Sequence, residues 1–315
     1  MIRSYLLAKT MVACGAIYFL LLMTYGYPFE SFDHQNYINF LADPSPFFFE
    51  PIYTLAAYII DLLDIDNRFL TIYLILGFLP SLLVLANNSK KIDQYFIYFW
   101  IFIKSSLIGF ISQRFWFAEM WAMYFYIFHN KRIVKLSIIP GLIHFGLLAN
   151  LPIFYYLKNG INRLFLFFFI TINLFIIYFV LSDYKFLNYN YSRYLYISND
   201  NSIIPSILNI SILILINNFL TNNYIKHKLL IVIILTIIYK LIFHHIEVFS
   251  RIFQSSIDII LITIFLNLKN KDLIFILPIY VILFILSIIF VSSTGPEIIL
   301  HHFNSIMNSI KNINQ

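Results

Sequence analysis

The sequence contains few charged residues and almost no cysteine. Asp, Glu, Lys and Arg make up 11% of its 315 residues, against about 25% in soluble domains. Its single cysteine, Cys14, lies in an apolar run, so one chain forms neither a disulfide framework nor a cysteine-based metal site. The sequence also has no Walker loop, zinc motif, dinucleotide fingerprint or nucleophile elbow. These absences argue against ATP-driven transport and against a nucleotide-sugar donor site of the usual soluble kind.

Apolar residues are abundant instead. They form 61% of the chain, and aromatic residues alone form 19%, mostly Phe and Tyr. Soluble domains are about 45–50% apolar, and a soluble core of this length does not absorb the excess, whereas a bilayer does. The composition therefore predicts an all-α polytopic membrane protein with one integral membrane domain over 1–315. We expect about 9–11 transmembrane helices, two of the segments being short or re-entrant.

A helix needs about 20 apolar residues to cross the hydrocarbon core. Candidate spans lie near 5–25 (taken as an uncleaved first span), 68–86, 93–110, 114–129, 164–182, 203–220, 229–243, 252–268 and 273–291. Two further apolar segments are interrupted. Segment 47–65 contains Pro51 and Asp61, and segment 133–157 contains Pro140-Gly141 and Pro152.

The distribution of basic residues sets the orientation. The net charge of +6 comes from small groups between apolar runs, which is typical of cytoplasmic loops and argues against a nucleic-acid partner. With Arg3 and Lys9 inside, loop 26–50 lies outside, and it contains four acidic residues and no Lys or Arg. The next basic turn belongs inside, so segment 68–86 supplies the one crossing required. Segment 47–65 is then expected not to span.

Segment 133–157 has basic clusters on both sides. Both clusters belong inside, so we expect a re-entrant pair of half-helices broken near its middle. Such a break is tolerated only where protein or a water-filled cavity surrounds it. The same scheme places loop 183–202 outside, together with an amphipathic C-terminal tail at about 295–315.

The outer side collects ionisable residues, which are costly at membrane depth and are functional candidates by default. Arg114 and Arg251 lie at outer helix ends, on the side that the positive-inside rule disfavours. They either snorkel to the interface or bind a fixed anion. Two guanidinium groups facing one cavity suit a pyrophosphate, because each donates two parallel hydrogen bonds to phosphate oxygens.

Asp33, Glu50 and His144 are the candidates for proton transfer or substrate orientation. Each has a structural alternative. In the structural alternative, Asp33 is an acid in a solvated loop, and Glu50 caps a helix that begins at Pro51. His144 satisfies backbone carbonyls at the helix break, or it bridges substrate hydroxyls.

The order of these residues resembles the EpsG family, which is related to the Wzy-type polysaccharide polymerases. The resemblance covers most of residues 25–265. It depends on five features in order: the acidic first loop with Asp33 and Tyr37; Glu50-Pro51 with Tyr53; Gln113-Arg114 before a span containing Ala118; Ile143-His144 on a Pro-Gly-interrupted helix; and a late Arg251.

The resemblance implies a multi-helix fold of the kind found in lipid-donor glycosyltransferases (GT-C-like). It implies polymerisation of undecaprenyl-pyrophosphate-linked oligosaccharide repeat units at the outer face of the bacterial inner membrane. The product is O-antigen, which is a component of lipopolysaccharide, or capsule or exopolysaccharide. The lipid-linked oligosaccharide is both donor and acceptor, and the pathway's flippase and a chain-length regulator are the expected partners.

The mechanism implied for this chain is an inverting transfer without cofactor or metal. Arg114 and Arg251 bind the pyrophosphate, and Asp33 or Glu50 accepts the acceptor's proton. His144 orients the acceptor or shares charge with the leaving group. The expected sugar contacts are Tyr37, Tyr53, Gln113, Arg193 and Glu247.

Two alternatives remain open at this point. One is a flippase or transporter for the same lipid-linked oligosaccharides, which also needs outward-facing arginines. The other is a membrane glycosyltransferase that takes one sugar from a polyprenyl-phosphate donor.

Overall fold

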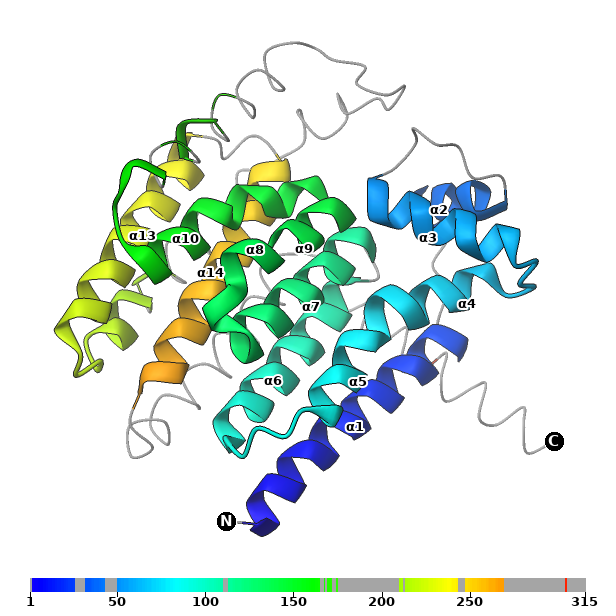
Figure 1. The fold of residues 1–315 in the computed structure, drawn as a ribbon, viewed down its shortest axis with the longest axis horizontal. Helices are drawn as coiled ribbons and strands as arrows, with labels where there is room; N and C mark the ends of the chain where they lie inside the picture. Colours follow the sequence, from blue (N-terminus) through cyan, green and yellow to red (C-terminus); the bar gives the residue numbers. More distant parts are fainter. Residues whose placement is uncertain are drawn as a thin grey trace. The chain divides into compact units, whose positions relative to one another are not determined.

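The computed structural model is mostly helical, and no residue of its described part belongs to a strand (Figure 1). It describes residues 2–25, 32–42, 50–109, 113–164, 167, 169–171, 174, 210–211, 213–242, 247–268 and 304. For some helical residues, Asp33 and Arg251 among them, it describes the backbone alone. The expected all-α class is confirmed.

The chain divides into two compact units. Unit 1 comprises residues 1–130, 142–144 and 294–315, and unit 2 comprises 131–141 and 145–293. A single membrane domain over 1–315 stays a prediction.

Unit 1 contains the helices that carry most of the candidate residues. Helix α1 (Ile2–Tyr25) packs on α6 (Ile92–Gly109), and α6 packs on α7 (Gln113–Phe128). One continuous helical stretch, Arg68–Ala86, consists of α4 (Arg68–Ile72), the π-helical η1 (Tyr73–Phe78) and α5 (Leu79–Ala86). The shorter α2 (Phe32–Ala42) and α3 (Pro51–Leu62) both contact α4.

The π-helical turn η1 packs directly on α7. A Cβ added to Gly77 would stand 2.4 Å from the indole ring of Trp116 and 2.8 Å from the ring of Phe117. Both aromatic side chains are fully buried. Glycine is required here because no other residue permits this helix contact without displacing a packed ring.

Unit 2 contains most of the interrupted segment and two long helices. The segment passes through η2 (Asn130–Arg132), α8 (Ile133–Leu136), α9 (Ile138–Ile143), η3 (Phe145–Asn150) and α10 (Leu151–Asn159). Helices α13 (Asn223–Ile242) and α14 (Glu247–Asn267) pack on each other. In addition, α13 packs on α10, and α14 packs on η3. Helix α10 ends at Gly160, whose φ of 75° is in the left-handed region that glycine favours.

The two interrupted segments form short helices, and their expected arrangement in a membrane stays a prediction. Helix α3 has 12 residues, which at 1.5 Å per residue is about 18 Å and too short to cross a bilayer. Segment 133–157 is broken into short helices, and His144 lies at the non-helical position between α9 and η3. The expected spans 5–25, 93–110, 114–129, 229–243 and 252–268 correspond to α1, α6, α7, α13 and α14. Most of 164–182 and all of 273–291 lie outside the described residues, as do 203–209 and 212 of the expected span 203–220.

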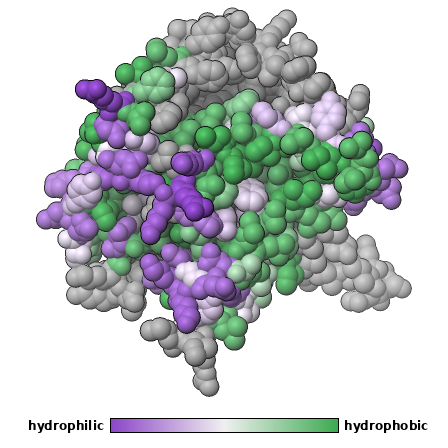
Figure 2. Space-filling view, in the orientation of Figure 1, coloured by the Kyte–Doolittle hydropathy of each residue, from purple (hydrophilic) through white to green (hydrophobic). Residues whose placement is uncertain are grey.

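One helical stretch in the described part is long and apolar enough to cross a membrane. It is Arg68–Ala86, with 19 residues and a mean hydropathy of 2.4. Pro51–Leu62 and Ser255–Asn267 are shorter apolar helices. Hydrophobic residues cover much of the molecular face in Figure 2.

Candidate functional site

The candidate site lies in unit 1, where three distant parts of the sequence meet. They are the middle of α2, the residue before α3 and the first turn of α7. The centre of the site is an ion pair between the Glu50 carboxylate and Nη1 of Arg114. Glu50 is 3% exposed and Arg114 6% exposed. A buried charge needs a partner in direct contact, and each of these residues supplies it for the other.

Glu50 occupies the N-cap position of α3, with Pro51 as the first helical residue. Its side chain makes no capping hydrogen bond, although its backbone carbonyl accepts one from Thr54 N at 2.9 Å. The carboxylate is therefore directed at Arg114 and not at the start of its own helix. The capping interpretation accounts for the position of Glu50 but not for its side chain.

Tyr37 of α2 contacts the same guanidinium group. Nε of Arg114 donates a hydrogen bond to Oη of Tyr37 at 3.3 Å, and the guanidinium carbon lies 5.7 Å from the centroid of the Tyr37 ring. A cation within about 6 Å of an aromatic centroid is attracted by the ring. Arg114 is thus fixed by a carboxylate from the start of α3 and by a phenol from α2.

Aromatic side chains exclude water from this ion pair. The Tyr53 ring is fully buried, 5.9 Å from the Tyr37 centroid and 6.4 Å from the Phe117 centroid. Phe40 lies on the α2 side of Tyr53, also 5.9 Å away. Charges interact more strongly in such a low-dielectric setting than they do in water. Tyr53 packs against Tyr37, the partner of Arg114, and its expected contact with sugar stays a prediction.

His144 reaches the same site from the helix break. Its ring packs edge-on against Phe115, the neighbour of Arg114, with centroids 5.5 Å apart and planes at 89°. Burial by itself raises the pKa of Glu50, but the charges of Arg114 and His144 outweigh burial and hold that pKa below its usual value. Glu50 is consequently ionised at neutral pH.

The structure describes the other candidate residues only in part. Gln113 is buried directly before Arg114. The backbone places Asp33 four positions before Tyr37 on α2, while its side chain is outside the described part. Glu247 and Arg251 lie in the first turns of α14, in unit 2, and their side chains are likewise outside the described part. Arg193 lies outside the described residues.

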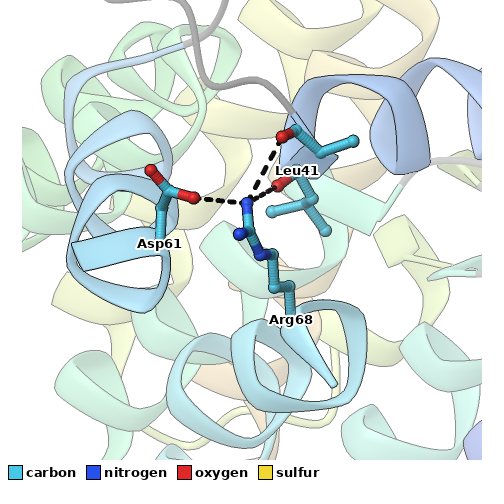
Figure 3. A network of polar contacts seen from close by, with 4 residues as sticks. Leu41, Asp61 and Arg68 are labelled. Atoms are coloured by element: carbon cyan, nitrogen blue, oxygen red, sulfur yellow. Dashed lines mark hydrogen bonds and ion pairs between the residues drawn. The ribbon is translucent and has the colours of Figure 1, made fainter. Parts of the chain in front are cut away.

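Sequence reasoning overlooked Arg68, whose contacts tie together the two helices that carry Tyr37 and Glu50. Nη1 of Arg68 lies 2.5 Å from Oδ1 of Asp61 in α3. The same nitrogen donates to the carbonyls of Leu41 at 2.9 Å and Ala42 at 3.3 Å, at the end of α2 (Figure 3). The available signal was an acid inside the apolar segment 47–65 and an arginine at the start of the next span.

No three His, Cys, Asp or Glu side chains in the described part are grouped so that they could hold a metal ion. The arrangement provides instead one guanidinium group, a carboxylate and an imidazole in an aromatic enclosure. It is suited to binding an anion and to moving a proton near it.

Comparison with known proteins found no matching family model, curated protein or solved structure. The resemblance to the EpsG family therefore stays a prediction from the residues.

Proposed function

We propose that this protein is a polytopic inner-membrane glycosyltransferase. In this proposal it polymerises undecaprenyl-pyrophosphate-linked oligosaccharide repeat units at the outer face of the membrane. One observation carries the proposal: Tyr37, Glu50, Arg114 and His144, four residues of the expected site from separate segments, gather around one buried ion pair.

Exposed apolar side chains support a membrane setting. On α3, Leu55, Ile59 and Leu62 are 58%, 45% and 84% exposed, although the opposite face of the helix buries Tyr53 and Ile60. A helix that is hydrophobic on all sides is unsuited to water. Similar exposed residues occur on α1 and α13, and Arg68–Ala86 has the length and hydropathy of a span. Several crossings are proposed from these helices together with the sequence.

The first turn of α7 supports an anionic ligand. The N-terminus of a helix carries a partial positive charge, and Arg114 adds a full one at the same place. A pyrophosphate offers oxygens in the spacing that a guanidinium group grips with two parallel hydrogen bonds. We propose that Arg114, together with Arg251, binds the donor pyrophosphate.

The proposed reaction breaks the bond between the donor sugar's anomeric carbon and the pyrophosphate oxygen. A hydroxyl oxygen of the acceptor sugar attacks that carbon from the opposite side, and its proton passes to a carboxylate of the site. The lipid pyrophosphate leaves with the bonding electron pair. Arg114 stabilises the charge that grows on this leaving group, and inversion follows from a single displacement.

The test is a strain that lacks the gene and expresses wild type, Arg114→Ala, Arg251→Ala or the control Arg132→Ala, which replaces an exposed arginine. Surface polysaccharide is resolved by length on gels, and lipid-linked repeat units are assayed on each leaflet. With normal amounts of mutant protein, we expect Arg114→Ala and Arg251→Ala to stop surface material at a single repeat unit. Repeat units trapped on the inner leaflet would mean a flippase and would overturn the proposal.

A further inference from the structure

We propose that Glu50 is an internal counter-anion, which the ligand's pyrophosphate displaces from Arg114, and not the proton acceptor of the reaction. This inference rests on the proposed function for the identity of the ligand. It assigns Glu50 a different role from the one its sequence position suggested, because the carboxylate occupies the place on Arg114 that a pyrophosphate needs.

An exchange of anions suits the burial of this site. Removing one partner of a buried ion pair is strongly destabilising, since the remaining charge is left uncompensated. Replacing the carboxylate by another anion avoids that cost, because the guanidinium group stays neutralised throughout. A pyrophosphate carries more charge than a carboxylate and receives the additional attraction of the α7 N-terminus.

Release of Glu50 does not require any part of α3 to unfold. Its side chain makes no capping bond to α3, and its backbone carbonyl alone holds the first turn through Thr54 N. Rotation of the carboxylate away from Arg114 therefore leaves the helix start intact. His144 acts electrostatically on Glu50, and its protonated imidazole provides a neighbouring cation for the released carboxylate.

The ionisation of Glu50 agrees with this role. A proton acceptor works best when its pKa is close to the working pH, whereas the site holds the pKa of Glu50 below its usual value. The proton acceptor is then a different carboxylate. Asp33 is the remaining candidate, four positions before Tyr37 on α2.

The experiment measures binding of inorganic pyrophosphate to the purified full chain in lipid nanodiscs by isothermal titration calorimetry. Glu50→Gln removes the competing charge with little change of volume. Asp61→Asn is the matched control, because it neutralises the acid of the other ion pair, Arg68–Asp61. We expect Glu50→Gln to bind pyrophosphate about tenfold more tightly than wild type, equal to about 1.4 kcal/mol. Asp61→Asn should bind as wild type does, and Arg114→Gln should lose binding.

Unchanged or weaker binding by folded Glu50→Gln would overturn the inference. If Glu50→Gln does not fold, Glu50→Asp replaces it, since a side chain shorter by one methylene weakens the pair while keeping the charge. It should bind pyrophosphate several-fold more tightly, by about 1 kcal/mol or less, and equal or weaker binding would again overturn the inference.

A second measurement separates this inference from the proposed function. With lipid-linked repeat units as substrate, Glu50→Gln should lower KM and keep kcat within about tenfold of wild type. Loss of a proton acceptor would instead lower kcat by about 10²–10⁴-fold. If wild type forms no polymer while Glu50→Gln binds pyrophosphate more tightly, the proposed function fails and the displaceable counter-anion stands. If wild type polymerises and Glu50→Gln does not bind pyrophosphate more tightly, the proposed function stands and the displaceable counter-anion fails.

Discussion

Tyr37 contacts Arg114 in two ways, with its hydroxyl accepting a hydrogen bond from Nε and its ring lying beside the guanidinium carbon. The two residues are 77 positions apart in the sequence. Helix α2 therefore contributes to the orientation of the arginine at the start of α7. Variants of Tyr37 can therefore remove the hydrogen bond alone or the hydrogen bond together with the ring.

Replacing Tyr37 by Phe should weaken pyrophosphate binding modestly. The hydrogen bond is long, at 3.3 Å, so its removal should cost about 1 kcal/mol, or about fivefold in affinity. Tyr37→Leu should cost more, because it also removes the ring beside the guanidinium group. Calorimetric titration with pyrophosphate checks the order, with Tyr58→Phe at an exposed position of α3 as the control. Equal affinities for wild type, Tyr37→Phe and Tyr37→Leu would mean that Tyr37 does not orient Arg114.

Acid should destabilise the wild type more than Glu50→Gln. The folded state lowers the pKa of Glu50, so the ion pair's stabilisation is fully present above the unfolded value of about 4.3. It is lost as the pH falls through the lower folded value. Thermal unfolding in nanodiscs between about pH 6 and 3 should show a smaller decrease of Tm for Glu50→Gln than for wild type. Parallel curves would contradict the buried pairing of Glu50 with Arg114.

Gly77→Ala should destabilise unit 1 by about 1–3 kcal/mol. The new methyl group would lie within 3 Å of the rings of Trp116 and Phe117, which are buried and cannot move aside. Gly15→Ala is the graded comparison, because its Cβ would stand 3.0 Å from the half-buried Phe99 ring, which can yield. Tm measurements on both variants check the order, and an unchanged Tm for Gly77→Ala would rule out the close packing of η1 on α7.

Asn150 should be a stability determinant of unit 2. Its amide donates to Ser255 Oγ at 2.5 Å and accepts from Ser256 Oγ at 3.0 Å, joining the start of α10 to α14. Asn150→Leu should cost about 1–3 kcal/mol, because it leaves two buried hydroxyls without these bonds. The triple variant with Ser255→Ala and Ser256→Ala should recover part of that loss. A triple variant less stable than Asn150→Leu would contradict this account.

The sequence was most informative where prolines, glycines and charges interrupt apolar runs. Pro51 and Asp61 bound a helix too short to span, and the Pro140-Gly141 interruption precedes the break at His144. Glu50 and Arg114 were singled out individually because ionisable groups are costly at membrane depth, and Tyr37 was singled out through the family resemblance. Their roles as partners of one another were not predictable, since a one-dimensional pattern does not show which side chains meet.

The contacts of Arg68 were also not predictable from the one-dimensional pattern. Arg68 was not singled out from the sequence, although it joins α2 to α3. The π-helical turn at Tyr73–Phe78 was likewise not predicted from the sequence. Asp33, Arg251, Glu247 and Arg193 remain predictions, as their side chains lie outside the described residues.

The most direct test of the central claim uses purified protein in liposomes that contain undecaprenyl-pyrophosphate-linked repeat units. Wild type and the control Arg132→Lys should produce a ladder of longer oligosaccharides and release undecaprenyl pyrophosphate. Arg114→Lys should produce no ladder, because an ammonium group cannot reproduce the two-bond grip of a guanidinium group. A ladder from Arg114→Lys equal to that of wild type, or no ladder from wild type, would contradict the account.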